Sequence, residues 1–149
     1  MQAPPKTILV VASEIEMRAV LRGWLEKRGL SVQEASDLEA AMKAIFRYPN
    51  LAAVICDHRL SDGGAINFLH WLREQLFAVP FLLITGRPEE GQKRGRGFDV
   101  IETPITGAGL REALSRLVDV DLLEPGMERT VQAGTRKVAK QKRRKSIVA

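Results

Sequence analysis

The stretch AAVICDHRLSDGGA, residues 52–65, joins an apolar run to a single acid. Its first five residues are apolar, Asp57 follows them directly, and the DGG triplet after it signals a turn. This pattern predicts a buried strand that ends at a carboxylate. Open α/β sheets bind their ligands outside the carboxyl ends of the strands, so Asp57 marks the edge where a functional site is expected.

The segments around this strand alternate between apolar runs and helical spacing. The runs that predict strands are 6–11, 30–35, 52–56, 81–85 and 98–101. Apolar residues three or four positions apart predict helices at 14–28, 38–48, 64–76 and 106–118. Strands that are apolar throughout suit a parallel sheet with helices on both faces, so the fold class predicted is α/β.

Residues 86–97, GRPEEGQKRGRG, have no apolar side chain and therefore no face with which a helix packs. We expect a shortened or disordered helix there, a loop or a frayed turn, between the fourth and fifth strands. The last predicted helix ends near residue 118, so the alternating pattern describes one domain over residues 1–121.

Composition indicates a globular protein of a reducing compartment. The 149 residues are 45% hydrophobic and 28% charged, and no apolar run is long enough to span a bilayer. The N-terminus lacks a charged region followed by an apolar core, so we expect no secretion signal. The one cysteine, Cys56, lies inside an apolar run and has no internal disulfide partner. These features predict a cytoplasmic protein.

Charge is distributed unevenly along the chain. Residues 125–149 hold eight Lys or Arg residues against one acid, Glu128, whereas residues 1–124 hold 15 basic and 17 acidic residues. We therefore predict a basic, flexible tail at 122–149, too poor in large apolar residues to fold alone. The tail cations expected to meet a partner are Arg136, Lys137, Lys140, Lys142, Arg143, Arg144 and Lys145. The alternatives are an acidic protein, nucleic acid, an anionic surface, or a solvated tail without a partner.

Four pieces of the sequence, in order, resemble the receiver domain of two-component response regulators. They are ILVVASEIEMR at 8–18, VICDHRLSDG at 54–63, PFLLITG at 80–86 and VIETPITGAGLREAL at 100–114. The resemblance implies a flavodoxin-like (CheY-like), doubly wound fold with five parallel strands in the order 2-1-3-4-5. It also implies a bacterial signal-transduction protein that is not an enzyme, with a histidine kinase or another signalling protein as partner.

Receivers, as the resemblance implies, use five groups to accept a phosphoryl group. Two acids after the first strand and the acceptor aspartate hold magnesium, while a hydroxyl and a lysine hold the phosphoryl oxygens. Here Asp57 stands at the acceptor position and Thr85 at the hydroxyl position. Ala12 and Ser13 replace the two acids, and Thr103 replaces the lysine. Two of the five groups are retained.

A working pocket would need substitutes from nearby residues. Glu14, one residue late, is the weak candidate for a second magnesium ligand beside Asp57. Arg59 or Arg87 is the candidate for the missing cation, and Pro104 is retained after the altered lysine position. The opposing interpretation is that Asp57 is a relic, hydrogen-bonded to Thr85 or Ser13, or paired with one of these arginines.

The sequence thus predicts an atypical receiver, a pseudo-receiver, that acts as a protein-interaction module without magnesium-dependent phosphorylation and without a cofactor. The first alternative is a working phosphorelay receiver that accepts phosphate on Asp57. The second is binding of nucleic acid or an anionic surface through the basic tail. A second copy of the chain is a further candidate partner.

Overall fold

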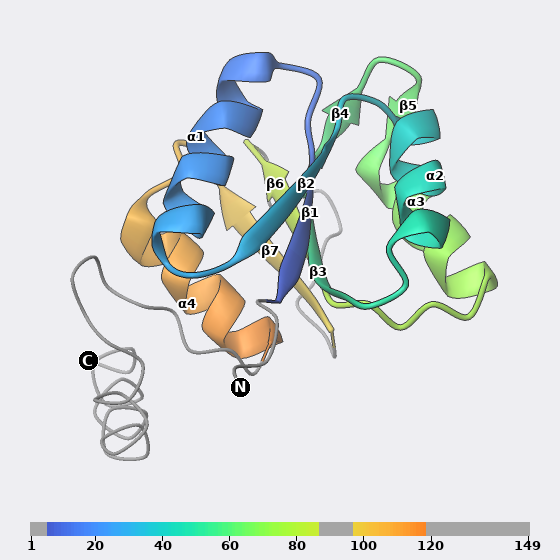
Figure 1. The fold of residues 1–149 in the computed structure, drawn as a ribbon. Helices are drawn as coiled ribbons and strands as arrows, with labels where there is room; N and C mark the ends of the chain where they lie inside the picture. Colours follow the sequence, from blue (N-terminus) through green and yellow to red (C-terminus); the bar gives the residue numbers. More distant parts are fainter. Residues whose placement is uncertain (1–5, 87–96, 119–149) are drawn as a thin grey trace, which may run out of the picture.

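The computed structural model describes residues 6–86 and 97–118 as a sheet between two pairs of helices (Figure 1). The sheet contains β1 (Thr7–Val11), β2 (Ser31–Ala35), β3 (Leu51–Asp57), β6 (Phe81–Thr85) and β7 (Phe98–Glu102). The helices are α1 (Ile15–Lys27), α2 (Leu38–Arg47), α3 (Ala65–Glu74) and α4 (Gly107–Leu117). Neighbouring strands are all parallel, in the order β2-β1-β3-β6-β7. This confirms the CheY-like fold and the predicted strand order.

The sheet is buried on both faces, which explains why its strands are apolar throughout. Successive strand residues point to opposite faces. Val10 and Ile55 therefore pack in the cluster beneath α1 and α4, whereas Val11 and Val54 pack in the cluster beneath α2 and α3. A strand with apolar residues on alternate positions only would leave one of these two helix pairs without a core.

A small hairpin after β3 was not predicted from the sequence. It consists of β4 (Arg59–Leu60) and β5 (Gly63–Gly64), which pair in the antiparallel sense. Asp62 lies at its tip and accepts hydrogen bonds from the backbone N–H groups of Leu38 at 2.7 Å and Glu39 at 3.1 Å. The hairpin thus satisfies two free donors in the first turn of α2.

Some predictions concern residues that the structure does not describe. Residues 87–96 and 119–149 lie outside the described part, so the expected shortened fourth helix, the boundary at 121 and the basic tail are not described here. Within 6–86 and 97–118, no helix is long and apolar enough to cross a membrane.

Candidate functional site

The predicted pocket residues meet at the carboxyl edge of the sheet. Asp57 is the last residue of β3, where it pairs with Ile84, and Thr85 is the last residue of the neighbouring strand β6. Ala12 and Ser13 directly follow β1, the neighbour of β3 on the other side. The fold therefore brings together at one edge the side chains that the sequence placed far apart.

Asp57 lies in an environment that disfavours its charge. Burial raises the pKa of this carboxyl, and the nearby Glu14 carboxylate raises it as well, while the backbone N–H of His58 acts in the opposite direction. Arg59 is exposed in β4 opposite Gly64 and forms no ion pair with Asp57. The structure therefore does not show the Arg59 pairing, one of the alternatives for Asp57, because the hairpin holds this arginine at the surface; Arg87 lies outside the described residues.

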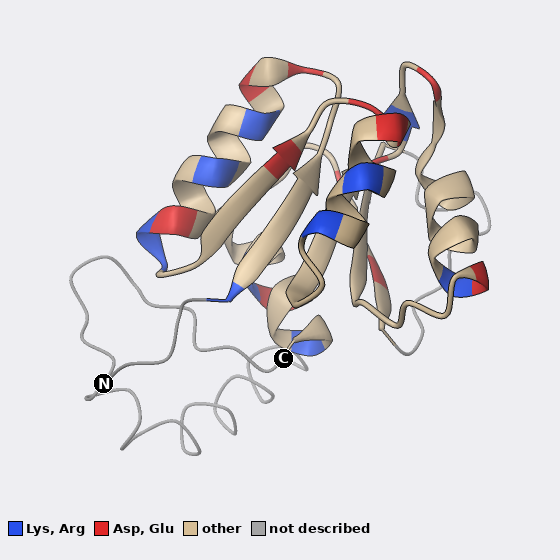
Figure 2. Cartoon of the chain, turned by 45° about the vertical axis from the view of Figure 1, so that its right-hand side comes forward, with Lys and Arg blue, Asp and Glu red and all other residues tan. Residues whose placement is uncertain are grey.

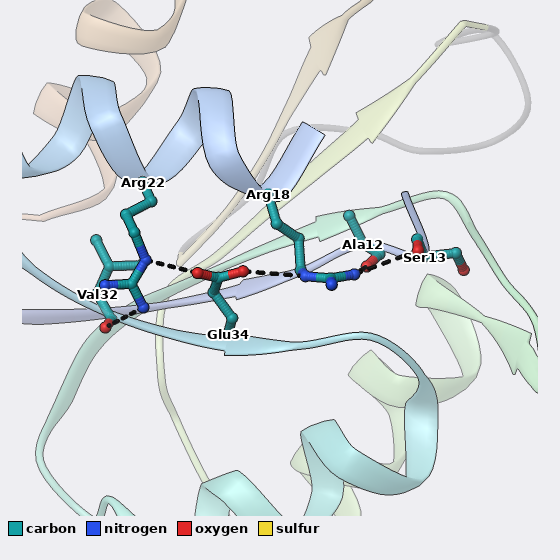
Figure 3. A network of polar contacts seen from close by, with 6 residues as sticks. All are labelled: Ala12, Ser13, Arg18, Arg22, Val32 and Glu34. Atoms are coloured by element: carbon teal, nitrogen blue, oxygen red, sulfur yellow. Dashed lines mark hydrogen bonds and ion pairs between the residues drawn. The ribbon is translucent and has the colours of Figure 1, made fainter. Parts of the chain in front are cut away.

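A cation lies against the turn where receivers would carry two acids (Figure 3). One guanidinium nitrogen of Arg18 donates to the carbonyl oxygens of Ala12 at 2.7 Å and of Ser13 at 3.2 Å. Its Nε donates to Glu34 at 3.0 Å, so the same side chain joins α1, this turn and β2. The turn after β1 thus presents backbone carbonyls to an arginine, and Ala12 has no exposed surface.

The position of the expected lysine carries a neutral hydroxyl. Thr103 follows β7, and its backbone N–H donates to the carbonyl of Thr85 at 3.0 Å. Its Oγ1 lies 3.3 Å from the place that a Cβ on Gly86 would occupy. The Thr103–Pro104 peptide is cis. Thr103 therefore lies next to the end of β6 but brings no positive charge.

Comparison with known proteins identifies the domain. No family model matches the chain. Over 87 residues, 58% of the chain, it is 39% identical to the KDP operon transcriptional regulatory protein KdpE of Escherichia coli (strain K12). That match spans 37% of the length of KdpE.

Solved structures give the same result. The receiver domain of the hybrid histidine kinase CckA is 26% identical, with a TM-score of 0.63, covering 74% of this chain and 97% of that domain. A response regulator receiver protein from Sinorhizobium medicae WSM419 is 21% identical, with a TM-score of 0.66. The match covers 78% of this chain and 97% of that protein. The chain contains a response-regulator receiver domain.

The magnesium site that the receiver resemblance implies lacks its two acids after β1, where this chain has Ala12 and Ser13. Magnesium needs oxygen ligands in octahedral geometry and draws on carboxylates and waters. The part of the chain that the structure describes holds no group of three or more His, Cys, Asp or Glu side chains suited to a metal ion. Among the described residues, Glu14 is the carboxylate whose charge raises the pKa of Asp57, and the backbone carbonyl of Ala12 accepts from Arg18.

Sequence reasoning missed the residues that shape this pocket. Glu34 accepts from Arg18 and also from the Nε of Arg22 at 2.5 Å, while Arg22 donates to the Val32 carbonyl at 3.2 Å. The hydrogen bond from Arg22 is the main cause that lowers the pKa of Glu34. The available signal was an acid within the short strand SVQEA together with two arginines one helical turn apart on the helix before it.

A groove beside the pocket is the other notable surface of the receiver domain. It lies between α1 and α4, has a volume of about 490 Å³ and ends at the segment after β7. Most of its lining is apolar, although Glu16 and two threonines also contribute. The main apolar residues are Met17, Val20, Leu21, Trp24, Pro104, Ile105 and Leu110. Val20 is 70% exposed, so a large apolar side chain faces solvent at this groove.

Proposed function

We propose that this receiver domain is a pseudo-receiver, a protein-interaction module of two-component signalling that does not use magnesium to accept phosphate on Asp57. The observation that carries the proposal is the Arg18 guanidinium bonded to the carbonyls of Ala12 and Ser13. Ala12 and Ser13, two residues without carboxylates, stand where the metal-binding acids would be, and Arg18 binds the backbone of their turn. The proposal places the protein in the cytoplasm.

Electrostatics support this proposal. An incoming phosphoryl group is anionic and would meet the carboxylates of Asp57 and Glu14. In a phosphoryl-transfer site a metal ion and a lysine offset this repulsion, and removing one such charge partner costs about 3–4 kcal/mol. Thr103 offers only a hydroxyl in place of the lysine. With both partners altered, transfer to Asp57 would be slow even when the geometry of the acceptor is kept.

The α1–α4 groove supports the interaction part of the proposal. Apolar grooves bind amphipathic helices through a few apolar anchors, and an aromatic residue in such a groove is a frequent source of binding energy. Val20 and Trp24 supply these features in the described domain. We assign the groove to a helix of a histidine kinase or of another signalling protein.

One observation favours the alternative, a receiver that is phosphorylated on Asp57. The charge of Glu14 raises the pKa of Asp57, so a second carboxylate lies within electrostatic range of the acceptor. Magnesium can bind through one or two carboxylates plus waters. In this alternative Glu14 supplies the second carboxylate, and Thr85 supplies the hydroxyl.

The test is phosphorylation of the full chain with acetyl phosphate and magnesium, read on a phosphate-affinity gel. We expect no shifted band for the wild type, as for Asp57→Asn. A variant with Ala12→Asp, Ser13→Asp and Thr103→Lys serves as the gain-of-function control and should show a shifted band. A wild-type band that needs magnesium and disappears in Asp57→Asn would establish the alternative.

A further inference from the structure

An exposed aromatic ring marks the surface where α2 meets α3. Phe46, near the end of α2, is 62% exposed. Its ring is nevertheless held edge-on against Trp71 and against Phe77, each with a centroid distance of 5.7 Å. Trp71 in turn stacks on the buried Phe68 at 6.1 Å. The exposed ring is therefore packed against other rings, as expected of an aromatic interface anchor.

A second apolar side chain beside this cluster is exposed at a backbone position that favours glycine. Leu76 has φ of +64° and follows the end of α3, where its N–H donates to the Arg73 carbonyl at 3.1 Å. The next N–H, of Phe77, donates to the Leu72 carbonyl at 2.9 Å. Helices that end in this pattern usually have glycine at the left-handed position. Leu76 is 89% exposed, so its side chain contributes little to the fold that would offset the strained backbone.

The charges around this patch are complementary to each other. Arg47 follows Phe46 on α2, and Glu74 lies one helical turn after Trp71 on α3. Neither charge forms an ion pair with a residue that the structure describes. Figure 2 shows basic residues along α2 after an acidic residue at its start, and a basic and an acidic residue side by side at the end of α3. One helix thus brings a cation and the other an anion to the rim of the same apolar patch.

We propose that the apolar patch formed by Phe46, Trp71, Leu76 and Phe77 is a homodimer interface. In this interface α2 of one copy faces α3 of a second copy. In a two-fold arrangement each contact occurs twice, so a surface must complement itself. This surface does so, because Arg47 would meet Glu74 of the other copy and Phe46 would meet its Leu76. The patch is small, so the dimer is expected in the micromolar to millimolar range.

Sedimentation velocity of the full chain over a concentration series tests the proposal. We expect a monomer–dimer equilibrium whose dissociation constant rises at least tenfold in Phe46→Glu. Ile15→Glu is the matched control, because Ile15 is 66% exposed on another helix and should leave the equilibrium unchanged. A wild-type chain that stays monomeric up to about 1 mM would overturn the proposal. So would an increase of the dissociation constant in Ile15→Glu as large as that in Phe46→Glu.

Leu76→Gly separates an interface role from a structural role. Glycine relieves the left-handed backbone, so the melting temperature should be unchanged or higher, yet dimerisation should weaken at least tenfold. The charges provide a second check that does not depend on Phe46. Arg47→Glu and Glu74→Arg should each weaken the dimer, and the two together should restore it. Unchanged dimerisation in Leu76→Gly, or no restoration in the double variant, would contradict the proposed arrangement.

Discussion

The centre and the flanks of the sheet's carboxyl edge differ in what they retain of a receiver pocket. At the centre, β3 and β6 end in Asp57 and Thr85, which are the residue types the family resemblance implies. At the flanks, β1 leads into Ala12 and Ser13, and β7 leads into Thr103, which are not. The central strands fix an acceptor position, but the flanking segments supply the charges that the chemistry needs. A retained aspartate is therefore weak support for phosphorylation when its flanks are altered.

The same two regions also differ in how their charges are compensated. At the β1 flank, the Glu34 carboxylate accepts from two arginines, and Arg18 also satisfies the carbonyls of the turn. At the centre, Asp57 is half-buried, and Glu14 is the other carboxylate that acts on its pKa. We therefore expect substitutions at the buried Ala12 or the ion-paired Glu34 of the flank to destabilise the domain, and neutralisation of the central acid to stabilise it.

The largest effect is expected when a flank residue is returned to the acid of a receiver pocket. Ala12→Asp should lower the free energy of unfolding by about 2–3 kcal/mol without metal, because it places a carboxylate at a position with no exposed surface. Ser13 is exposed, so Ser13→Asp is the matched control and should change stability little. Urea denaturation followed by circular dichroism measures both. Equal free energies of unfolding for Ala12→Asp and wild type would contradict the prediction, because a carboxylate at position 12 would then carry no burial cost.

A smaller loss is expected when the charge network of the flank is broken. Glu34→Gln should cost about 1 kcal/mol at pH 7, a modest value because these ion pairs are partly exposed. Glu39→Gln is the matched control, since its pair with Lys43 is largely exposed and 3.7 Å long. Thermal melting of the three proteins measures the effect.

Acid should remove the Glu34 contribution. The folded-state pKa of Glu34 lies below the ordinary value of 4.5, so its stabilisation is present above that value and is lost as the pH falls through the folded-state pKa. The difference between Glu34→Gln and wild type should therefore shrink under acid. A difference that is constant from pH 7 to pH 3 would show that the lost contribution is packing and not charge.

The elements that follow hydrophobic patterning could be predicted from the sequence, and those that depend on hydrogen bonds between distant segments could not. All five strands of the sheet were predicted because a sheet buried on both faces needs continuous apolar runs. The β4–β5 hairpin depends on Asp62 reaching the start of α2, a contact between residues 24 positions apart. The hydrogen bond from Arg18 to Glu34 likewise depends on how close α1 lies to β2, and hydrophobic periodicity does not predict that distance.

The pocket residues show the same limit. Spacing along the chain was enough to place Asp57 and Thr85 at neighbouring strand ends, because parallel strands align their carboxyl ends. Spacing also pointed to Glu14 as a second carboxylate, but it could not show that Arg59 lies at the surface. Side-chain direction at a turn depends on the local backbone, which the hairpin after β3 determines.

The smallest expected effect has the opposite sign to the others. Asp57→Asn should raise the melting temperature by about 2–4 °C at pH 7, which corresponds to roughly 0.5 kcal/mol in a domain of this size. The reason is that burial and the Glu14 carboxylate disfavour the charged form, as the raised pKa of Asp57 shows. An Asp57 held in an ion pair would lose stability on the same substitution.

The dependence on pH makes this last prediction sharper. Because the folded-state pKa of Asp57 lies above its ordinary value of 3.8, the wild-type penalty is full at neutral pH and declines as the pH falls through the folded-state pKa. The advantage of Asp57→Asn should therefore vanish near pH 3.8 and below. Glu14→Gln should give a smaller rise in melting temperature at pH 7. The rise in the double variant with Asp57→Asn should be less than the sum of the rises in the two single variants. A lower melting temperature of Asp57→Asn at pH 7 would contradict the prediction. It would mean that a cation compensates Asp57, as Arg18 and Arg22 compensate Glu34.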